Sequence, residues 1–375
     1  MSSISVNTIT DASGGATTSI NGFTPTVSNM AGRNRIINGD MRIDQRNAGA
    51  AVSPMSGAYA IDRWVGSYLG SGVGRFSAQQ SSTAPSGFSK SWLITVTTSD
   101  GAPSASYGYM VEQWIEGYNI ADLGFGSASA SPITVSFWVR SSVTGTFPLI
   151  IYNGAGTRTY GATYTITSAN TFEYKTVTIT GDTTGTWASD NTAGLALIFG
   201  FGGGSSRTLS TGWQAASGAT PTNVTGCTSL IATSGATFYI TGVQLEEGSV
   251  ATPFEHRQYG QELALCQRYY YRTKRTGSAT TCIGNAHVYN STAVYSVYPF
   301  KQTMRAAPTG NRSSASDFSI LSAGVNYVPS TVILQSANED QVEIALLGLT
   351  GAPTGNGAWL RFQTDDAWMD FSAEL

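Results

Sequence analysis

Apolar and polar positions alternate along much of this chain. The clearest alternation lies in the segment SPITVSFWVR, where Ile133, Val135, Phe137 and Val139 alternate with Thr134, Ser136, Trp138 and Arg140. A period of two places successive side chains on opposite faces of a β-strand. The apolar set therefore predicts a core face, and the set that contains Trp138 predicts an outer face.

Strand patterns of this kind recur between residues 36 and 257, separated by Gly, Asn, Asp and Pro. Further examples are IDRWVGSY, SWLITVTT, YGYMVEQWI, FPLIIYN, FEYKTVTIT, GLALIFGF and TFYITGVQLE. Eight or more strands punctuated by turn residues predict an all-β fold, a two-sheet sandwich of jelly-roll type. In FEYKTVTIT the apolar residues stand at even-numbered positions up to Tyr174 and at odd-numbered positions from Val177. This switch from one strand face to the other predicts a β-bulge.

The two ends of this region differ from it in pattern. Residues 1–35 are rich in Gly, Ser and Thr and have too few apolar positions for a core, so they predict an extended N-terminal arm. A neighbouring subunit or a docking platform is the simplest candidate to hold such an arm. Residues 273–375 contain short alternating runs such as AVYSVYPF and VEIALLGL, which predict a smaller C-terminal β domain.

A short helix is predicted to link the two β domains. In residues 258–272, QYGQELALCQRYYYR, helical spacing places Tyr259, Leu263, Cys266 and Tyr270 on one stripe. This stripe predicts an amphipathic helix, and Leu263, Cys266 and Tyr270 are candidates for contacts between subunits.

Composition narrows the classes of function. Charged residues make up 11% of the chain, against about 25% in an average soluble domain. Uncharged hydroxyl and amide groups must therefore provide most of the polar surface. The net charge of −3 provides no basic field for nucleic acid. The start MSSISVNTIT lacks a secretory pattern, and no apolar run approaches the length of a membrane span, so we expect a soluble protein made in a cytoplasm without membrane insertion.

Several phrases of the sequence resemble the tail-fibre proteins of phages and prophages. The opening NGFTPTVSNMAGRNRIINGDMRIDQRNAG, followed by YAIDRW, is similar to the start of such fibres. VEQWIEGYNIADL, ITVSFWVRSS and FYITGVQLEEGSVATPFEHR resemble a jelly roll like that of carbohydrate-binding modules, and QRYYYR with TMRAAPT resembles a distal fibre segment. The resemblance implies a trimeric fibre or receptor-binding spike on a virion.

A cluster of arginines near the arm has two readings. Arg33, Arg35, Arg42 and Arg46 lie within fourteen residues of one another, beside Asp40 and Asp44. They either dock onto an acidic surface of another virion protein or pair internally at the base of the domain.

Trp138 and Arg140 are the candidate glycan contacts. A sugar ring can stack on the indole while Arg140 hydrogen-bonds its hydroxyls, and the alternative is that Trp138 packs beneath a loop. Trp64, Trp114 and Trp213 are weaker candidates, since tryptophan is highly buried on average.

Catalysis has little support in the sequence. His256 and His287, the only histidines, stand outside any nucleophile or zinc motif, and we assign neither a metal nor a cofactor. Adjacent carboxylates such as Glu246 and Glu247 point to opposite faces of a strand and cannot act on one bond together.

The resemblance to phage tail fibres implies a structural virion fibre, and the lack of a catalytic motif predicts that it is not an enzyme. We expect a homotrimer that assembles in the host cytoplasm and attaches to the phage tail through its N-terminal region. Its β domains are expected to recognise the host surface, with a surface glycan as the first candidate receptor. Two alternatives stay open, a fibre or decoration protein on the capsid and a glycan depolymerase.

Overall fold

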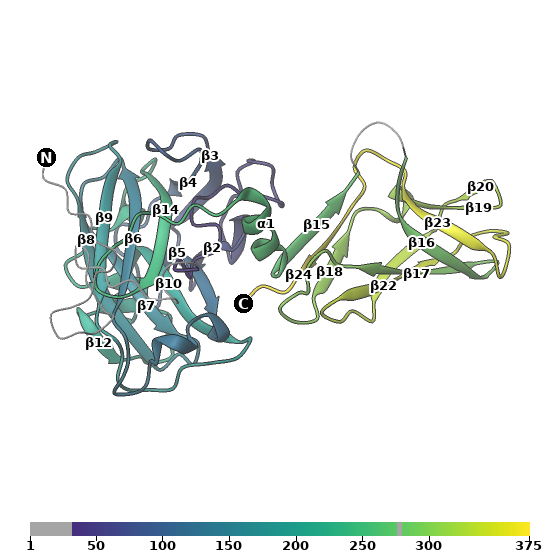
Figure 1. Ribbon diagram of the computed structural model, residues 1–375. Helices are drawn as coiled ribbons and strands as arrows, with labels where there is room; N and C mark the ends of the chain where they lie inside the picture. Colours follow the sequence, from purple (N-terminus) through teal and green to yellow (C-terminus); the bar gives the residue numbers. More distant parts are fainter. Residues whose placement is uncertain (1–31, 276–279) are drawn as a thin grey trace, which may run out of the picture. The chain divides into compact units, whose positions relative to one another are not determined.

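The computed structural model describes residues 32–275 and 280–375, which form two compact units that divide between Arg257 and Gln258 (Figure 1). The regular secondary structure of both units is mainly β-strand, so the prediction of an all-β, jelly-roll-like fold is confirmed. Most of the predicted N-terminal arm lies outside the described residues. Its last four residues, 32–35, belong to the first unit, where Asn34 is buried.

The first unit is a sandwich of two sheets. The smaller sheet has the strand order β3 (Arg75–Ser81), β4 (Ser91–Thr98), β14 (Thr237–Glu247), β6 (Ile133–Ser141) and β9 (Glu173–Ile179). The larger sheet has the order β1 (Ala58–Ile61), β2 (Trp64–Leu69), β5 (Gly108–Glu116), β10 (Ala193–Gly203), β7 (Gly145–Asn153), β8 (Arg158–Ile166) and β12 (Gly212–Ala215). A short parallel pair, β11 (Thr208–Leu209) and β13 (Asn223–Val224), completes the unit.

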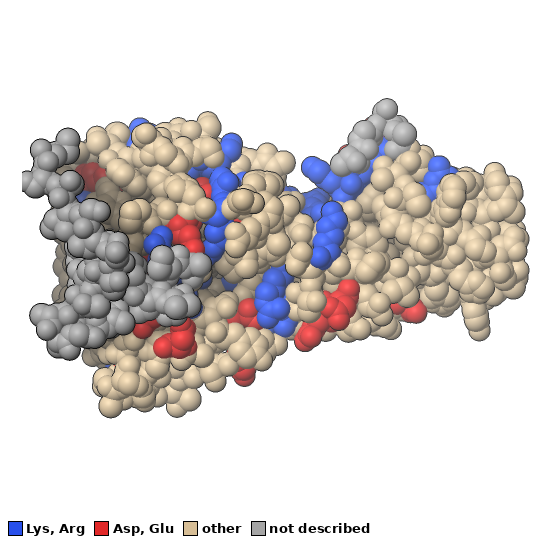
Figure 2. Space-filling model, in the orientation of Figure 1, with Lys and Arg blue, Asp and Glu red and all other residues tan. Residues whose placement is uncertain are grey.

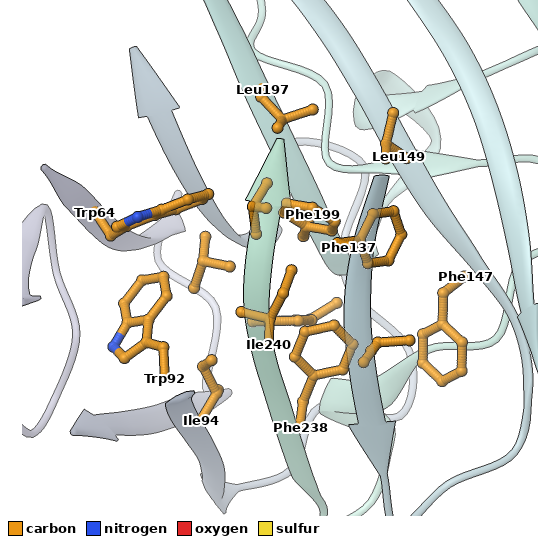
Figure 3. Close-up of a cluster of buried hydrophobic side chains, with 14 of the residues drawn as sticks. Trp64, Trp92, Ile94, Phe137, Phe147, Leu149, Leu197, Phe199, Phe238 and Ile240 are labelled. Carbon is orange, nitrogen blue, oxygen red and sulfur yellow. The ribbon is translucent and has the colours of Figure 1, made fainter. Parts of the chain in front are cut away.

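The core of the sandwich lies between the two sheets and is rich in aromatic rings (Figure 3). Phe137 of β6 packs edge-on against Phe199 of β10, with ring centroids 5.1 Å apart, which ties the smaller sheet to the larger one. Ile133, Val135, Phe137 and Val139 are fully buried, as their alternation predicted. Burial of each such side chain contributes about 1.5–3 kcal/mol.

The pairing of the smaller sheet is irregular in β14 and not in β9. The pairing of β6 with β9 runs without interruption from Ile133 to Val139, so the bulge predicted between Tyr174 and Val177 is wrong. The parity changes there because Tyr174 is an outer-face residue and not a core residue. The register instead shifts in β14 between Thr241 and Gln244.

The second unit contains a three-stranded and a seven-stranded sheet. The first has the order β15 (Tyr270–Lys274), β24 (Trp368–Ser372) and β18 (Thr309–Arg312). The second has the order β20 (Val325–Tyr327), β19 (Phe318–Ser322), β23 (Gly357–Phe362), β16 (Thr281–Asn290), β17 (Ala293–Pro299), β22 (Gln341–Leu347) and β21 (Thr331–Gln335). A separate apolar core, which includes Phe318, Leu360 and Phe371, holds this unit together.

Helix α1 spans Tyr259–Gln267 and is shorter than the predicted segment 258–272. Tyr270 lies in β15, so its predicted place on the helical stripe is wrong. Tyr259 is 56% exposed, while Glu262, Cys266 and Gln267 are the buried side chains, so the buried face of the helix matches the predicted apolar stripe only at Cys266. The helix has too few turns for apolar spacing alone to set which face is buried.

The remaining helical segments in the described part of the chain are single 3₁₀ turns. They are η1 (Gly117–Asn119), η2 (Ala121–Leu123), η3 (Ser205–Arg207), η4 (Leu230–Ala232) and η5 (Ala315–Asp317). Within residues 32–275 and 280–375, no helix has the length and apolar character needed to cross a membrane. Charged side chains are sparse on the face shown in Figure 2, as the composition suggests.

Candidate functional site

The outer face of the smaller sheet carries an aromatic cluster in the first unit. Strand alternation turns Trp138 away from the core, and the register places it directly opposite Tyr174 of β9 and Thr241 of β14. The rings of Trp138 and Tyr174 lie 5.4 Å apart, and Tyr174 is 44% exposed. Two aromatic rings therefore meet solvent side by side on one sheet face.

Two further chain segments complete a pocket of about 440 Å³ over this cluster. Its lining residues are Ser86, Gly87, Phe88, Trp138, Tyr174, Gly242, Pro253, Phe254 and His256. Phe88 comes from the β3–β4 connection, and its ring lies 5.2 Å from Phe254 and 5.4 Å from His256. A volume of this size falls in the range of small-molecule sites, which is roughly 300–1,000 Å³.

Gly242 allows the two sides of the pocket to approach each other. It lies in the bulge of β14 with φ +62°, a left-handed conformation that favours glycine. A Cβ atom at this position would come within 2.6 Å of Phe88 Cζ and 3.2 Å of Trp138 Cδ1. Any larger residue would therefore push Phe88 away from Trp138.

A buried polar network holds the segment that carries Phe254 and His256. Gln244 Nε2 donates to Glu246 Oε1 over 2.8 Å, and Thr252 Oγ1 donates to Glu246 Oε2 over 2.6 Å. Glu255 accepts hydrogen bonds from the backbone N–H groups of Gly32 and Asn34. Gln244 and Glu246, which bond to this segment, are buried, whereas Trp138 on the same sheet face is only half-buried.

The electrostatics of Glu255 keep the same segment anchored. Burial by itself raises the pKa of Glu255, but the N–H of Asn34 and the positive charge of Arg257 outweigh this effect and hold the pKa below its ordinary value. The carboxylate therefore stays charged, and its hydrogen bonds persist, at neutral pH.

Arg140 lies on the same face, two residues along β6 from Trp138. Its guanidinium carbon is 4.9 Å from the ring centroid of Tyr239 and 6.0 Å from that of Phe172. Its Nε atom is buried and has no hydrogen-bond partner among the described residues. The two residues that the sequence proposed as glycan contacts are thus both on the outer face, although only Trp138 lines the pocket.

No known family model matches the chain, and no curated protein sequence matches it. Solved structures resemble part of it. A domain of bacteriophage CBA120 tailspike protein 4, described as enzymatically active, is 14% identical with a TM-score of 0.28. That match covers 57% of this chain and about a fifth, 21%, of the tailspike chain.

Carbohydrate-binding modules are also among the similar structures. A CBM4 module is 14% identical with a TM-score of 0.27, over 56% of this chain and 97% of the module. TmCBM61, solved with β-1,4-galactotriose, is 12% identical with a TM-score of 0.27, over 57% of this chain and 99% of the module. The ligands and activities in these descriptions belong to those proteins.

The four arginines proposed for virion docking all have partners inside the first unit. Arg33 Nη2 donates to the carbonyl of Pro253, and Arg35 Nη2 pairs with Asp122 Oδ2 at 2.6 Å. Arg42 pairs with Asp40 and donates to the carbonyl of Arg257, while Arg46 lies 3.5 Å from Asp62. Internal pairing, the alternative reading, accounts for their positions. Docking through them stays a prediction.

The candidate trimer contacts differ in accessibility. Cys266 and Tyr270 are buried within the chain, and the hydroxyl of Tyr270 donates to Asp370 Oδ2 over 2.9 Å. Leu263 is half-buried and keeps part of its surface. A subunit contact at these positions therefore depends mainly on Leu263 and stays a prediction.

The weaker tryptophan candidates lie elsewhere. Trp64 is fully buried in the sandwich core, and its indole Nε1 donates to the carbonyl of Asn38. Trp114 packs against Tyr152 on the far side of the larger sheet, and Trp213 packs in a cluster with Phe125 and Trp187. None of these three lines the pocket.

A second hollow, of about 410 Å³, lies in the second unit. It is lined by Asn285, Ala286, Leu321, Ala323, Gly324, Gly357, Ala358 and Trp359. Trp359 is 56% exposed, but only Asn285 adds a side-chain amide beside it. Among the described residues, no group of three or more His, Cys, Asp or Glu side chains could hold a metal ion.

Phe88, Phe254 and His256 could not be assigned to the site from the sequence, because the chain positions of loop residues give no sign of their spatial neighbours. The segment TGV at 241–243 was the available signal. A glycine inside a strand pattern indicates a bulge or a close approach of another group, and Gly242 provides both.

Proposed function

We propose that this chain is a glycan-binding fibre subunit of a phage virion. The observation that carries the glycan-binding part is the solvent-facing pair of Trp138 and Tyr174 within a pocket of about 440 Å³. The virion part rests on the resemblance of the sequence to phage tail fibres.

The pocket has the chemistry that sugar recognition requires. A sugar ring has an apolar C–H face that stacks on an aromatic ring and a rim of hydroxyls that need hydrogen-bond partners. Trp138 and Tyr174 provide the platform, while Ser86, His256 and the backbone of Gly87 supply polar groups at the rim. Phe88 and Phe254, whose rings lie 5.2 Å apart, add further apolar surface to the lining of the pocket.

We further propose that the chain binds glycan without cleaving it. Cleavage by the usual route requires two carboxyl groups on either side of the scissile bond. The described residues that line the Trp138 pocket include no Asp or Glu, and Glu246 is held by Gln244 and Thr252. The depolymerase alternative predicts new reducing ends when purified protein is incubated with host capsule or lipopolysaccharide. Our proposal predicts none.

A glycan microarray of bacterial surface polysaccharides tests the binding function. We expect the full chain to bind a restricted set of glycans, and we expect Trp138→Ala to lose them. Binding that is unaffected by Trp138→Ala would place the site elsewhere, and the absence of any bound glycan would overturn the proposal.

Immunogold electron microscopy of phage particles tests the virion role. We expect label on the tail, at the tip of a fibre. Label on the capsid would favour the decoration alternative, and label found only outside particles would reject the virion role.

Light scattering of the purified chain tests the homotrimer. It is expected to give three times the chain mass of 39.4 kDa, whereas a stable monomer would reject the trimer.

A further inference from the structure

We infer that the glycan recognised at the Trp138 pocket carries an oxyanion, a carboxylate or a phosphate ester, and that Arg140 binds it. This inference rests on the proposed glycan-binding function and specifies the class of glycan. It is motivated by a cation that is held on the binding face without an internal anion.

Arg140 lies close to Trp138 on β6. Residues 138 and 140 are on the same face of β6 and about 7 Å apart along the strand, because a strand rises about 3.3 Å per residue. Tyr239 lies directly opposite Arg140 in the register, and Thr241 lies opposite Trp138. A ligand that stacks on Trp138 and extends along β6 therefore meets the guanidinium.

Arg140 lacks a carboxylate partner in the described part of the chain. Among residues 32–275 and 280–375, no ion pair joins Arg140 to a carboxylate, and its Nε is buried without a hydrogen bond. Glu173, opposite Val139 in the register, is already engaged by Lys175, Thr167 and Ser168. Burial by itself raises the pKa of Glu173, but the hydrogen bonds from these partners outweigh this effect and lower the pKa to about 2. The carboxylate is therefore charged and already engaged.

Two aromatic rings lie beside the guanidinium of Arg140. Tyr239 and Phe172, whose ring centroids lie 6.2 Å apart, contact the guanidinium and limit its movement. Such contacts stabilise a cation without consuming its N–H donors. A guanidinium held in this way presents a planar fork, which matches carboxylate and phosphate oxygens better than single hydroxyls.

The environment favours an anion over a second cation. The outer-face neighbours of Arg140 are aromatic or hydroxyl residues, namely Tyr239 and Thr241 of β14 and, on the β9 side, Phe172 and Tyr174. The carboxylate of Glu246 lies at the other end of the face, in the buried network with Thr252. The charge of Arg140 is thus not neutralised on its own part of the outer face.

The test compares matched glycans on one array. The array carries uronic-acid oligosaccharides, the same oligosaccharides with their carboxyl groups reduced to alcohols, phosphorylated oligosaccharides and neutral oligosaccharides. We expect the full chain to bind an acidic glycan about tenfold or more tightly than its reduced counterpart, since a hydrogen bond to a charged group contributes about 1.5–3 kcal/mol. The acidic class that is bound distinguishes carboxylate from phosphate.

Substitutions then assign the preference to Arg140. Arg140→Gln should remove the acidic preference while binding of neutral counterparts stays within about twofold, and Arg140→Lys should retain part of it. Arg361→Gln, in the second unit, removes the same charge and should change nothing. Trp138-dependent binding of neutral glycans alone, or an acidic preference that survives in Arg140→Gln, would overturn the inference but leave the glycan-binding function standing.

Discussion

Trp138 of β6 and Tyr174 of β9 are direct cross-strand partners whose ring centroids lie 5.4 Å apart. If both rings contact one ligand, each substitution to Ala should weaken its binding by about tenfold or more. Isothermal titration with a glycan selected from the array measures this effect. The thermal midpoint should change little for Tyr174→Ala, because this side chain is 44% exposed.

Trp359→Ala is the matched control for the tryptophan substitution. Trp359 is 56% exposed and belongs to the second unit, so its removal should leave the affinity unchanged. A loss of affinity in Trp359→Ala equal to that in Trp138→Ala would mean that the hollow in the second unit also binds the glycan.

Gly242→Ala should close the pocket and destabilise the first unit. The new Cβ meets Phe88 Cζ at 2.6 Å, and φ +62° costs a non-glycine residue about 1–2 kcal/mol. We expect lower affinity and a lower thermal midpoint. In the Phe88→Ala background the steric part disappears, so the further loss of stability on Gly242→Ala should be smaller. Equal losses in both backgrounds would show that Phe88 does not approach Gly242.

Asn34→Ala should destabilise the first unit by about 3 kcal/mol, since three buried hydrogen bonds contribute about 1 kcal/mol each. Asn34 Nδ2 donates to the carbonyl of Val243 over 3.1 Å, and Oδ1 accepts from the N–H groups of Ile36 and Leu245. Chemical denaturation measures the loss. Asn119→Ala, at a half-buried position, is the control and should cost less than about 1 kcal/mol.

Glu112 should make stability fall as pH rises. Burial raises the pKa of Glu112 from 4.5 to about 7, against the opposing effect of a hydrogen bond with Trp114, and its Oε2 has no partner among the described residues. Because the folded state holds the proton more tightly, stability decreases between pH 4.5 and pH 7 and is flat above. The full effect is on the order of 3 kcal/mol.

Glu112→Gln removes this titration. The variant should gain stability relative to the parent at pH 8 and lose the gain at pH 4.5, as measured by denaturation at both values. Glu339→Gln, at an exposed position, controls for the loss of one carboxylate. A gain of the same size at both pH values would show that the effect of Glu112→Gln is not electrostatic.

The sequence was sufficient to predict which side chains of β6, the strand that carries Trp138, face the core. Strict alternation in 131–140 placed Phe137 inside and Trp138 outside, because period-two burial leaves one arrangement for a strand with a single core face. The sequence was not sufficient to place Tyr174 on the outer face, because its position was interpreted as part of a β-bulge. An aromatic residue on an outer face has the same apolar signature as one in the core.

The pocket itself depends on contacts between distant parts of the chain. Phe88 and Phe254 are separated by most of the first unit in sequence, yet their rings lie 5.2 Å apart. The arginine cluster was ambiguous for the same reason, since partners such as Asp122 for Arg35 are distant in the sequence. Local pattern thus predicts which face a residue occupies, and only the fold shows which other residues share that face.

A crystal structure of the full chain with an array-selected glycan tests the central claim most directly. We predict a sugar ring stacked on Trp138 and Tyr174, bordered by Phe88 and His256, with an acidic group on Arg140. A bound glycan that leaves these side chains uncontacted would contradict it.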